Sequence, residues 1–147
     1  MRLAQIQMHV TADKAANLRH AEELLRSVRG ADMAILPEMF CCPYDNSCFR
    51  AYGEPAGGAA YQMLSRAARE LGLWLVGGSL PELDDGRVYN TSFVFDPQGA
   101  CVARHRKMHL FDIDVEGGQR FRESDTLSPG NDVTLFDTPW GRMGLCI

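Results

Sequence analysis

The sequence predicts an α/β fold built on a mixed β-sheet. The first observation is a strand–helix–strand order near the N-terminus, which is the start of a βαβ unit. The second is that the chain contains about seven short strand-like segments and two segments whose apolar residues have the spacing of an amphipathic helix. With 147 residues, of which 46% are hydrophobic and 23% are charged, the chain is long enough for one domain with a substantial core.

The first βαβ unit is expected between residues 3 and 36. Leu3–Met8 is predicted as a strand, with Ala4, Ile6 and Met8 on one face. Thr11 or Asp13 can cap a helix that runs to about Val28 and ends at Arg29-Gly30. The apolar run Met33–Leu36 is typical of a strand that is covered on both faces. The apolar stripe of the helix consists of Leu18, Ala21, Leu25 and Val28.

The second half of the chain alternates further elements with long polar segments. Cys41–Gly58 and Phe111–Asp132 are predicted as long loops, because Pro, Gly, Asp and Asn are frequent in them. Asp96-Pro97-Gln98-Gly99 is predicted as a hairpin loop, and Pro139-Trp140-Gly141 as a second turn. One more helix, over Ala59–Leu71, ends at Gly72. The remaining strands are expected over Trp74–Val76, Ser92–Phe95, Ala100–Ala103, Val133–Phe136 and Met143–Ile147.

Two helices can cover only one face of a sheet of about seven strands, and a mixed sheet needs both faces covered. We therefore expect the missing cover to come from chain beyond Ile147 or from another subunit. We also expect residues 1–147 alone to be unstable, because one sheet face and the strand edge at Met143–Ile147 would stay uncovered. We expect them to be inactive as well, because a thiolate nucleophile would be missing.

Composition excludes several function classes. The net charge is −4 and the basic residues are spread along the chain, which argues against a nucleic-acid partner. The apolar runs are too short to cross a bilayer, and the N-terminal segment lacks the apolar core of a signal peptide, so we expect no membrane partner and a cytoplasmic location. Five cysteines without a Cys-x-x-Cys pair favour free thiols over a disulfide framework or a metal site.

Two charged residues at strand ends are candidates for chemistry. Glu38 directly follows an apolar strand and could act as a general base, although an acid at such a place can also be solvated or cap a helix. Lys107 ends the basic run Arg104–Lys107, which can be a solvated sheet edge or can turn one amine inward to stabilise an oxyanion.

Glu123 and Cys146 are weaker candidates. Glu123 can be a surface acid, or a second carboxylate that positions Lys107 or the substrate. Cys146 lies within the predicted strand Met143–Ile147, where a cysteine is most often a small core residue. We therefore expect Cys146 to pack in the core and not to be a nucleophile, with a cost of about 1 kcal/mol for its replacement by alanine.

Taken together, these regions resemble the nitrilase superfamily of carbon–nitrogen hydrolases, and most closely its omega-amidase branch. The resemblance extends in order over nearly the whole chain. The matching segments are Leu36-Pro37-Glu38, Cys42-Pro43-Tyr44, Gly77-Gly78-Ser79-Leu80-Pro81-Glu82, Tyr89-Asn90-Thr91, Arg106-Lys107-Met108-His109-Leu110-Phe111-Asp112-Ile113-Asp114, Glu123-Ser124-Asp125-Thr126-Leu127-Ser128-Pro129-Gly130 and Gly141-Arg142-Met143-Gly144-Leu145-Cys146-Ile147.

The resemblance implies a fold and a catalytic set. The fold is an α-β-β-α sandwich that often pairs into dimers, and residues 1–147 would be the N-terminal part of one such domain. The family uses a glutamate base, a lysine that stabilises the tetrahedral intermediate, a cysteine nucleophile and a helper glutamate. By motif these roles fall on Glu38, Lys107 and, for the helper, Glu123. The nucleophile belongs directly after Ile147, and Cys146 matches a variable position.

The resemblance also implies a function. It is hydrolysis of a small amide, such as a short dicarboxylate monoamide, to an acid and ammonia through a cysteine thioester, with no cofactor and no metal. Tyr44 and the loop through Gly58 are expected to wall the substrate pocket, because this segment is long and starts just after Glu38. Nitriles and carbamoyl compounds remain open as substrates. The alternative is a non-catalytic fragment or binding module that keeps the fold.

Overall fold

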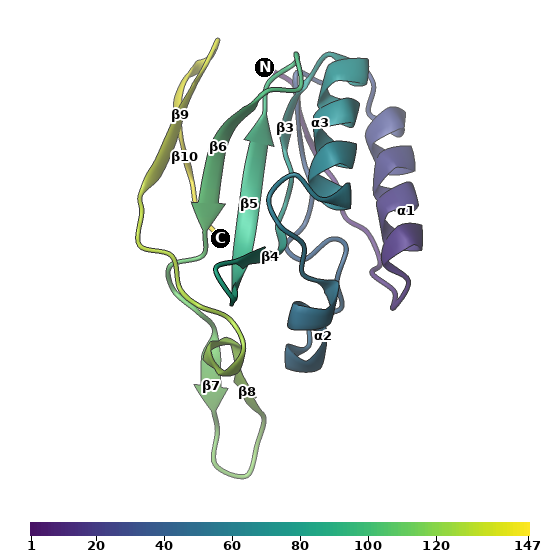
Figure 1. Cartoon of the computed structure of the whole chain (residues 1–147). Helices are drawn as coiled ribbons and strands as arrows, with labels where there is room; N and C mark the ends of the chain where they lie inside the picture. Colours follow the sequence, from purple (N-terminus) through teal and green to yellow (C-terminus); the bar gives the residue numbers. More distant parts are fainter.

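The computed structural model describes residues 1–147, and a six-stranded mixed sheet forms its centre (Figure 1). The strands β1, β2 and β3 are parallel, whereas β5 runs antiparallel to β3, β4 and β6. The long strand β5 pairs with β3 and β4 along one edge and with β6 along the other. The bounds are β1 Leu3–Gln5, β2 Met33–Ile35, β3 Trp74–Val76, β4 Leu80–Asp84, β5 Arg87–Phe95 and β6 Cys101–Arg106.

Two helices, α1 (Lys14–Ser27) and α3 (Ala59–Leu71), cover one face of this sheet (Figure 1). The side chain of Asp13 caps α1 by accepting a hydrogen bond of 2.9 Å from the amide of Ala16. Gly72 ends α3 in the left-handed conformation, with φ at 64°. Both helices were predicted from the sequence, and the bounds of α3 are those expected.

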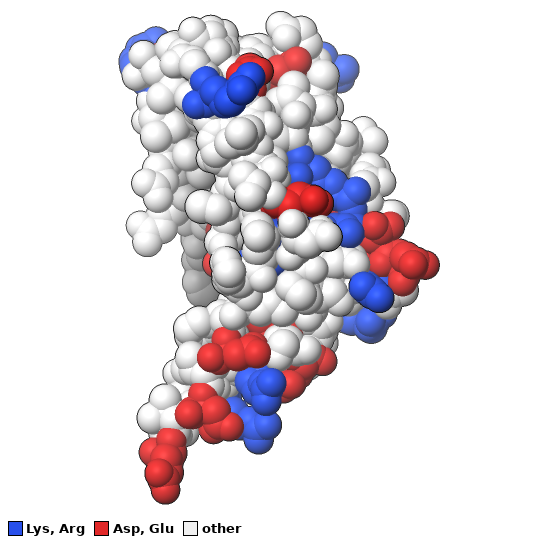
Figure 2. Space-filling view, turned by 90° about the vertical axis from the view of Figure 1, so that its left-hand side faces the viewer, with Lys and Arg blue, Asp and Glu red and all other residues white.

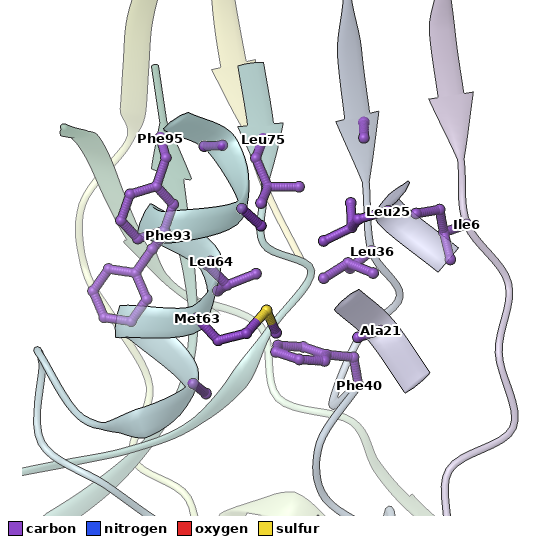
Figure 3. Close-up of a cluster of buried hydrophobic side chains, with 14 of the residues drawn as sticks. Ile6, Ala21, Leu25, Leu36, Phe40, Met63, Leu64, Leu75, Phe93 and Phe95 are labelled. Carbon is purple, nitrogen blue, oxygen red and sulfur yellow. The ribbon is translucent and has the colours of Figure 1, made fainter. Parts of the chain in front are cut away.

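The main core lies between these helices and the sheet. Its buried side chains come from both helices, from the sheet and from the segments that follow β1 and β2 (Figure 3). Members of both predicted helix stripes and Ile6 are among them, whereas Phe40 and Met63 were not predicted. Burying a large aliphatic or aromatic side chain contributes about 1.5–3 kcal/mol, so this layer supplies much of the stability. The labelled members are Ile6, Ala21, Leu25, Leu36, Phe40, Met63, Leu64, Leu75, Phe93 and Phe95.

The opposite face of the sheet is covered by a hairpin of the same chain (Figure 1). Strands β9 (Thr134–Thr138) and β10 (Gly141–Leu145) pair with each other, and Phe136 packs against Trp74 with ring centroids 6.4 Å apart. The smaller core between hairpin and sheet consists of Met33, Trp74, Val76, Val94 and Phe136, with Ile35, Ala103, Met143 and Leu145 partly buried against it. The expectation that cover for this face must come from elsewhere was therefore wrong for this apolar part of the face.

Besides a short 3₁₀ helix, four further elements were missed in segments that were predicted as loops or were left unassigned. A short helix, α2 (Asn46–Tyr52), lies within the loop predicted over Cys41–Gly58, because Asp45 caps it and Phe49 is buried under it. Strand β4 contains a proline and two acidic residues, so its composition is unlike that of a strand, and in the structure Glu82 and Asp84 pair with Arg106. The other two are β7 (Asp112–Asp114) and β8 (Arg120–Arg122), which form a small hairpin.

The β7–β8 hairpin projects from the body of the molecule as an arm (Figure 1). Figure 2, which views the side that carries β9 and β10, shows acidic and basic side chains interspersed over this arm at the bottom of the molecule. Two of the ion pairs there join Arg120 to Asp114 and Arg122 to Asp112, at 3.7 Å and 3.8 Å. None of the helices in the structure has the length and apolar character needed to span a membrane.

Candidate active site

Glu38 lies on a tight turn directly after β2. The next residue, Met39, has a φ of 51°, which is a left-handed conformation that non-glycine residues rarely adopt. The segment after β3 holds this turn in place. The hydroxyl of Ser79 accepts a hydrogen bond of 3.0 Å from the Met39 amide, and the backbone of Gly78 lies so close to the Pro37 carbonyl that any side chain at Gly78 would collide with it.

Lys107 directly follows β6, and the alternation of that strand turns it inward. Arg104 and Arg106 point to the opposite face, where both contact the buried carboxylate of Glu82. Lys107 is buried, with only 7% of its surface exposed. Its amide donates a hydrogen bond of 2.8 Å to the carbonyl oxygen of Asn90, which continues the β5–β6 pairing by one residue. The inward amine is therefore held by a rigid two-stranded ribbon.

The two predicted carboxylates meet at the Lys107 ammonium. Nζ of Lys107 lies 2.9 Å from Oε1 of Glu38 and 3.1 Å from Oε2 of Glu123. Burial by itself would lower the pKa of Lys107, but the hydrogen bonds and charges of the two carboxylates outweigh burial, and the net pKa is raised. The amine therefore stays protonated at neutral pH and can donate hydrogen bonds but not accept a proton.

Glu123 is fully buried on the short 3₁₀ helix η1 (Glu123–Asp125), and both of its carboxylate oxygens are occupied. Oε1 accepts a hydrogen bond of 2.5 Å from the Tyr44 hydroxyl, and Oε2 accepts one from the amide of Phe111. Burial raises the pKa of Tyr44, and its hydrogen bond to Glu123 raises that pKa further. Because both oxygens of Glu123 accept hydrogen bonds, this carboxylate is suited to holding Tyr44, Lys107 and the Phe111 amide in position.

Glu38 differs from Glu123 because only one of its oxygens is occupied. Oε1 accepts hydrogen bonds from Lys107 and, at 2.7 Å, from Nδ2 of Asn90, whereas Oε2 has no hydrogen-bond partner in the protein. The side chain is 39% exposed and borders a cavity of about 190 Å³. The cavity is lined by Ile35, Leu36, Glu38, Val76, Gly78, Ser79, Ser92, Leu145, Cys146 and Ile147.

Tyr44 lies next to this cluster through its bond to Glu123. Its ring stacks on that of Phe121 with centroids 5.5 Å apart and packs edge-on against Phe49. Tyr44 does not border the 190 Å³ cavity, so its contact with the cluster runs through Glu123. Its part in binding substrate stays a prediction.

Cys146 does not pack in the core, and that part of the sequence prediction was wrong. The residue is exposed and lies just after β10, with some of its atoms bordering the cavity. The hairpin touches the main sheet through one face only, and Met143 and Leu145 occupy that face. Because side chains alternate along a strand, Gly144 and Cys146 turn away from the sheet.

The sequence reasoning did not single out two positions that shape the cluster. Asn90 is fully buried and bonds Glu38, and Ser79 fixes the turn that carries Glu38. Asn90 could have been found from its strand, because Asn90, Ser92 and Val94 share a face with Lys107 once β5 is extended to Arg87. The Ser79 contact joins two strand ends that are distant in the sequence, and no local pattern marks it.

Comparison with known proteins identifies the family and the fold. A family model described as "Carbon-nitrogen hydrolase" matches residues 2–147. The chain is 47% identical to omega-amidase NIT2 of Danio rerio over 148 aligned residues that cover 99% of this chain and 53% of that protein. It is 49% identical to omega-amidase NIT2 of Bos taurus, with coverage of 99% and 54%.

Solved structures show the same fold. Nit3 of Saccharomyces cerevisiae, described as a member of branch 10 of the nitrilase superfamily, superposes with a TM-score of 0.83 at 35% identity. That alignment covers 98% of this chain and 54% of the Nit3 chain. The chain thus spans about half the length of the relatives that it matches.

Proposed function

Because this chain belongs to the carbon–nitrogen hydrolase family, we propose that it carries the acid–base and oxyanion-stabilising groups of an omega-amidase-like active site. The observation that carries the proposal is the difference between the two carboxylates on Lys107. Glu123 is bound through both oxygens, and Glu38 keeps one oxygen free beside a cavity. This difference favours Glu38 as the proton acceptor and Glu123 as the group that holds Lys107 and Tyr44.

Lys107 suits the stabilisation of an oxyanion. An ammonium has three donors, of which Glu38 and Glu123 engage two. The third is free to donate to the oxygen of a tetrahedral intermediate, in surroundings where burial strengthens such a bond. The raised pKa of Lys107 keeps the charge that this role requires.

The proposed reaction is attack of a cysteine thiolate on the carbonyl carbon of a small amide. Following the family pattern, we assign the nucleophile to the position after Ile147, and the lining of the cavity by Leu145, Cys146 and Ile147 supports this, since the strand end then leads toward Glu38. Glu38 takes the thiol proton and returns it to the departing nitrogen, so that ammonia leaves and a thioester remains. Water then attacks the thioester, Glu38 accepts a proton from that water, and the acid is released with the thiol restored.

The proposed substrate class is a short dicarboxylate monoamide, on the strength of the named omega-amidase relatives. A homodimeric, cytoplasmic protein is part of the same proposal, and light scattering on the full-length protein tests the oligomeric state. The alternative function is a binding module that keeps the fold without turnover. The open Oε2 of Glu38 beside the cavity favours the enzyme, because a general base needs an oxygen that the proton of a nucleophile can reach.

Release of ammonia by the full-length protein tests the proposal. Short dicarboxylate monoamides should be hydrolysed faster than simple amides of equal length, and mass spectrometry of the quenched enzyme should detect the acyl adduct on one cysteine. Glu38→Gln should lower kcat by about 10²–10⁴-fold. The control Asp137→Asn alters an exposed carboxylate on β9 and should leave kcat unchanged. Absence of turnover and of any adduct, with a folded protein, would favour the binding module.

A further inference from the structure

We propose that Asn90 is a positioning residue that fixes Glu38 so that its Oε2, and not its Oε1, is the proton-accepting oxygen. The proton-accepting role of Oε2 rests on the proposed amidase function, whereas the claim that Asn90 fixes the orientation of the Glu38 carboxylate does not depend on it. Asn90 is completely buried, and its side chain reaches across from β5 to the turn after β2. It is one of only two protein groups that hold the Glu38 carboxylate, the other being Lys107.

The orientation of the Asn90 amide follows from charge. A carboxylate only accepts hydrogen bonds, so the NH₂ group must face Glu38 and the carbonyl oxygen must face away. That oxygen, Oδ1, is buried and has no partner in the protein. An unpartnered buried acceptor is costly and uncommon, so an asparagine in this place is best explained by the need for its donor.

Asn90 and Lys107 act on the same oxygen from adjacent places on one ribbon. The Lys107 amide donates to the Asn90 carbonyl at 2.8 Å, and both side chains then reach Oε1 of Glu38, at 2.9 Å for Lys107 and 2.7 Å for Asn90. Two donors on one oxygen fix the direction of the carboxylate plane. With Lys107 alone, the half-exposed Glu38 side chain could rotate and offer either oxygen.

The fixed direction has a chemical consequence. An oxygen that already accepts two short hydrogen bonds is a weak proton acceptor, whereas Oε2 is unoccupied on a side chain that borders the cavity. Asn90 therefore assigns the two oxygens to separate tasks, one for holding and one for proton transfer. A misplacement of a reacting group by about 1 Å can cost about 10²-fold in rate, which sets the expected effect.

The test compares Asn90→Ala with Thr91→Val in the full-length protein. Thr91 is the neighbouring buried residue, and its side chain bonds Glu82 on the opposite face of β5, so Thr91→Val removes one buried hydrogen bond to a carboxylate without touching the cluster. Asn90→Ala should lower kcat by about 10²-fold with little change in KM. Thr91→Val should keep kcat within about twofold of the parent protein. Equal kcat values for the two variants, both folded, would overturn the inference.

A second readout does not depend on turnover. In a crystal structure of Asn90→Ala, the Glu38 carboxylate should be rotated, so that Oε1 is no longer the one oxygen that contacts Nζ of Lys107. If Glu38 keeps Oε1 on Lys107 and Oε2 toward the cavity, the positioning role is wrong, whatever the activity. If the parent protein shows no amidase turnover but Glu38 moves in the variant, the proposed function fails and the positioning role stands.

Discussion

At the scale of single residues, a lysine between two carboxylates dominates the site. Lys107 and Glu123 are both buried, and each supplies the counter-charge that makes burial of the other tolerable. Glu123 also accepts hydrogen bonds from Tyr44 and from the Phe111 amide. Removing either partner of the ion pair should therefore cost more than removing both.

Lys107→Met should lower the free energy of unfolding by about 3 kcal/mol, because it leaves the Glu123 carboxylate buried without its cation. Adding Glu123→Gln removes that charge and should recover part of the loss. Urea unfolding of the two single variants and the double variant gives the coupling energy. Strictly additive losses would mean that the two charges do not depend on each other.

Cys146→Ala should change the free energy of unfolding by no more than about 0.5 kcal/mol, because Cys146 is exposed, in contrast with the larger cost expected for a core cysteine. The full-length variant should also keep most of its amidase activity. Ammonia release measures the activity, and chemical unfolding measures the change in the free energy of unfolding. Complete loss of turnover in a folded variant, with substrate trapped on Cys146 of the parent protein, would make Cys146 the nucleophile.

At the scale of elements, a histidine joins the hairpin to the sheet. Nδ1 of His105, on β6, lies 3.0 Å from the hydroxyl of Thr134, on β9. His105 is buried, and burial lowers its pKa, with an opposing contribution from the charge of Asp132. The neutral imidazole is therefore the form that the folded state prefers.

The stability of the protein should therefore fall on acidification below about pH 6.5, the ordinary histidine value. Above that pH, His105 is neutral in both states. Below it, the unfolded chain binds a proton that the folded chain resists, so the unfolded state is favoured. In unfolding measurements from about pH 7.5 to about pH 5.5, His105→Gln should flatten this decline, whereas His20→Gln, at an exposed position on α1, should not. An identical slope in the parent protein and His105→Gln would show that His105 does not contribute.

At the scale of the whole molecule, three layers enclose two apolar cores. Helices α1 and α3 close one side of the sheet, and the β9–β10 hairpin closes the apolar part of the other (Figure 1). The candidate active site lies beside the layer formed by the β9–β10 hairpin, since Leu145 and Ile147 border the same cavity as Glu38. The hairpin thus serves both stability and the shape of the site.

Phe136→Ala should lower the free energy of unfolding by about 3 kcal/mol, because Phe136 is the buried residue of the hairpin that stacks on Trp74. Leu135→Ala is the matched control on the same strand, since Leu135 is 58% exposed and faces the other way, and it should stay within about 0.5 kcal/mol. Chemical unfolding of both variants provides the comparison. Similar losses in the two would mean that the hairpin is not held through Phe136.

Local sequence patterns were sufficient to predict the elements that depend on residues close together in the sequence. The stripe Ala60, Leu64, Ala67 and Leu71 with its glycine stop determined α3, and the alternation of Ala4, Ile6 and Met8 determined the inward face at β1. The cap at Asp45 was equally local, but turn-like composition around it concealed α2. Motif resemblance to a known family, more than any single pattern, brought Glu38, Lys107 and Glu123 forward together.

The tertiary structure alone decided how those residues act on one another. The contact of Lys107 with Glu38 joins positions 69 residues apart, and the contact of Tyr44 with Glu123 joins positions 79 apart, so neither leaves a periodic signal. The sequence by itself determined α1, α3 and the inward face at β1, because propensity and alternation act over a few residues. The cover of the second sheet face by β9–β10, the exposure of Cys146 and the free oxygen of Glu38 depend on which distant surfaces meet. Only packing of the whole chain determines that.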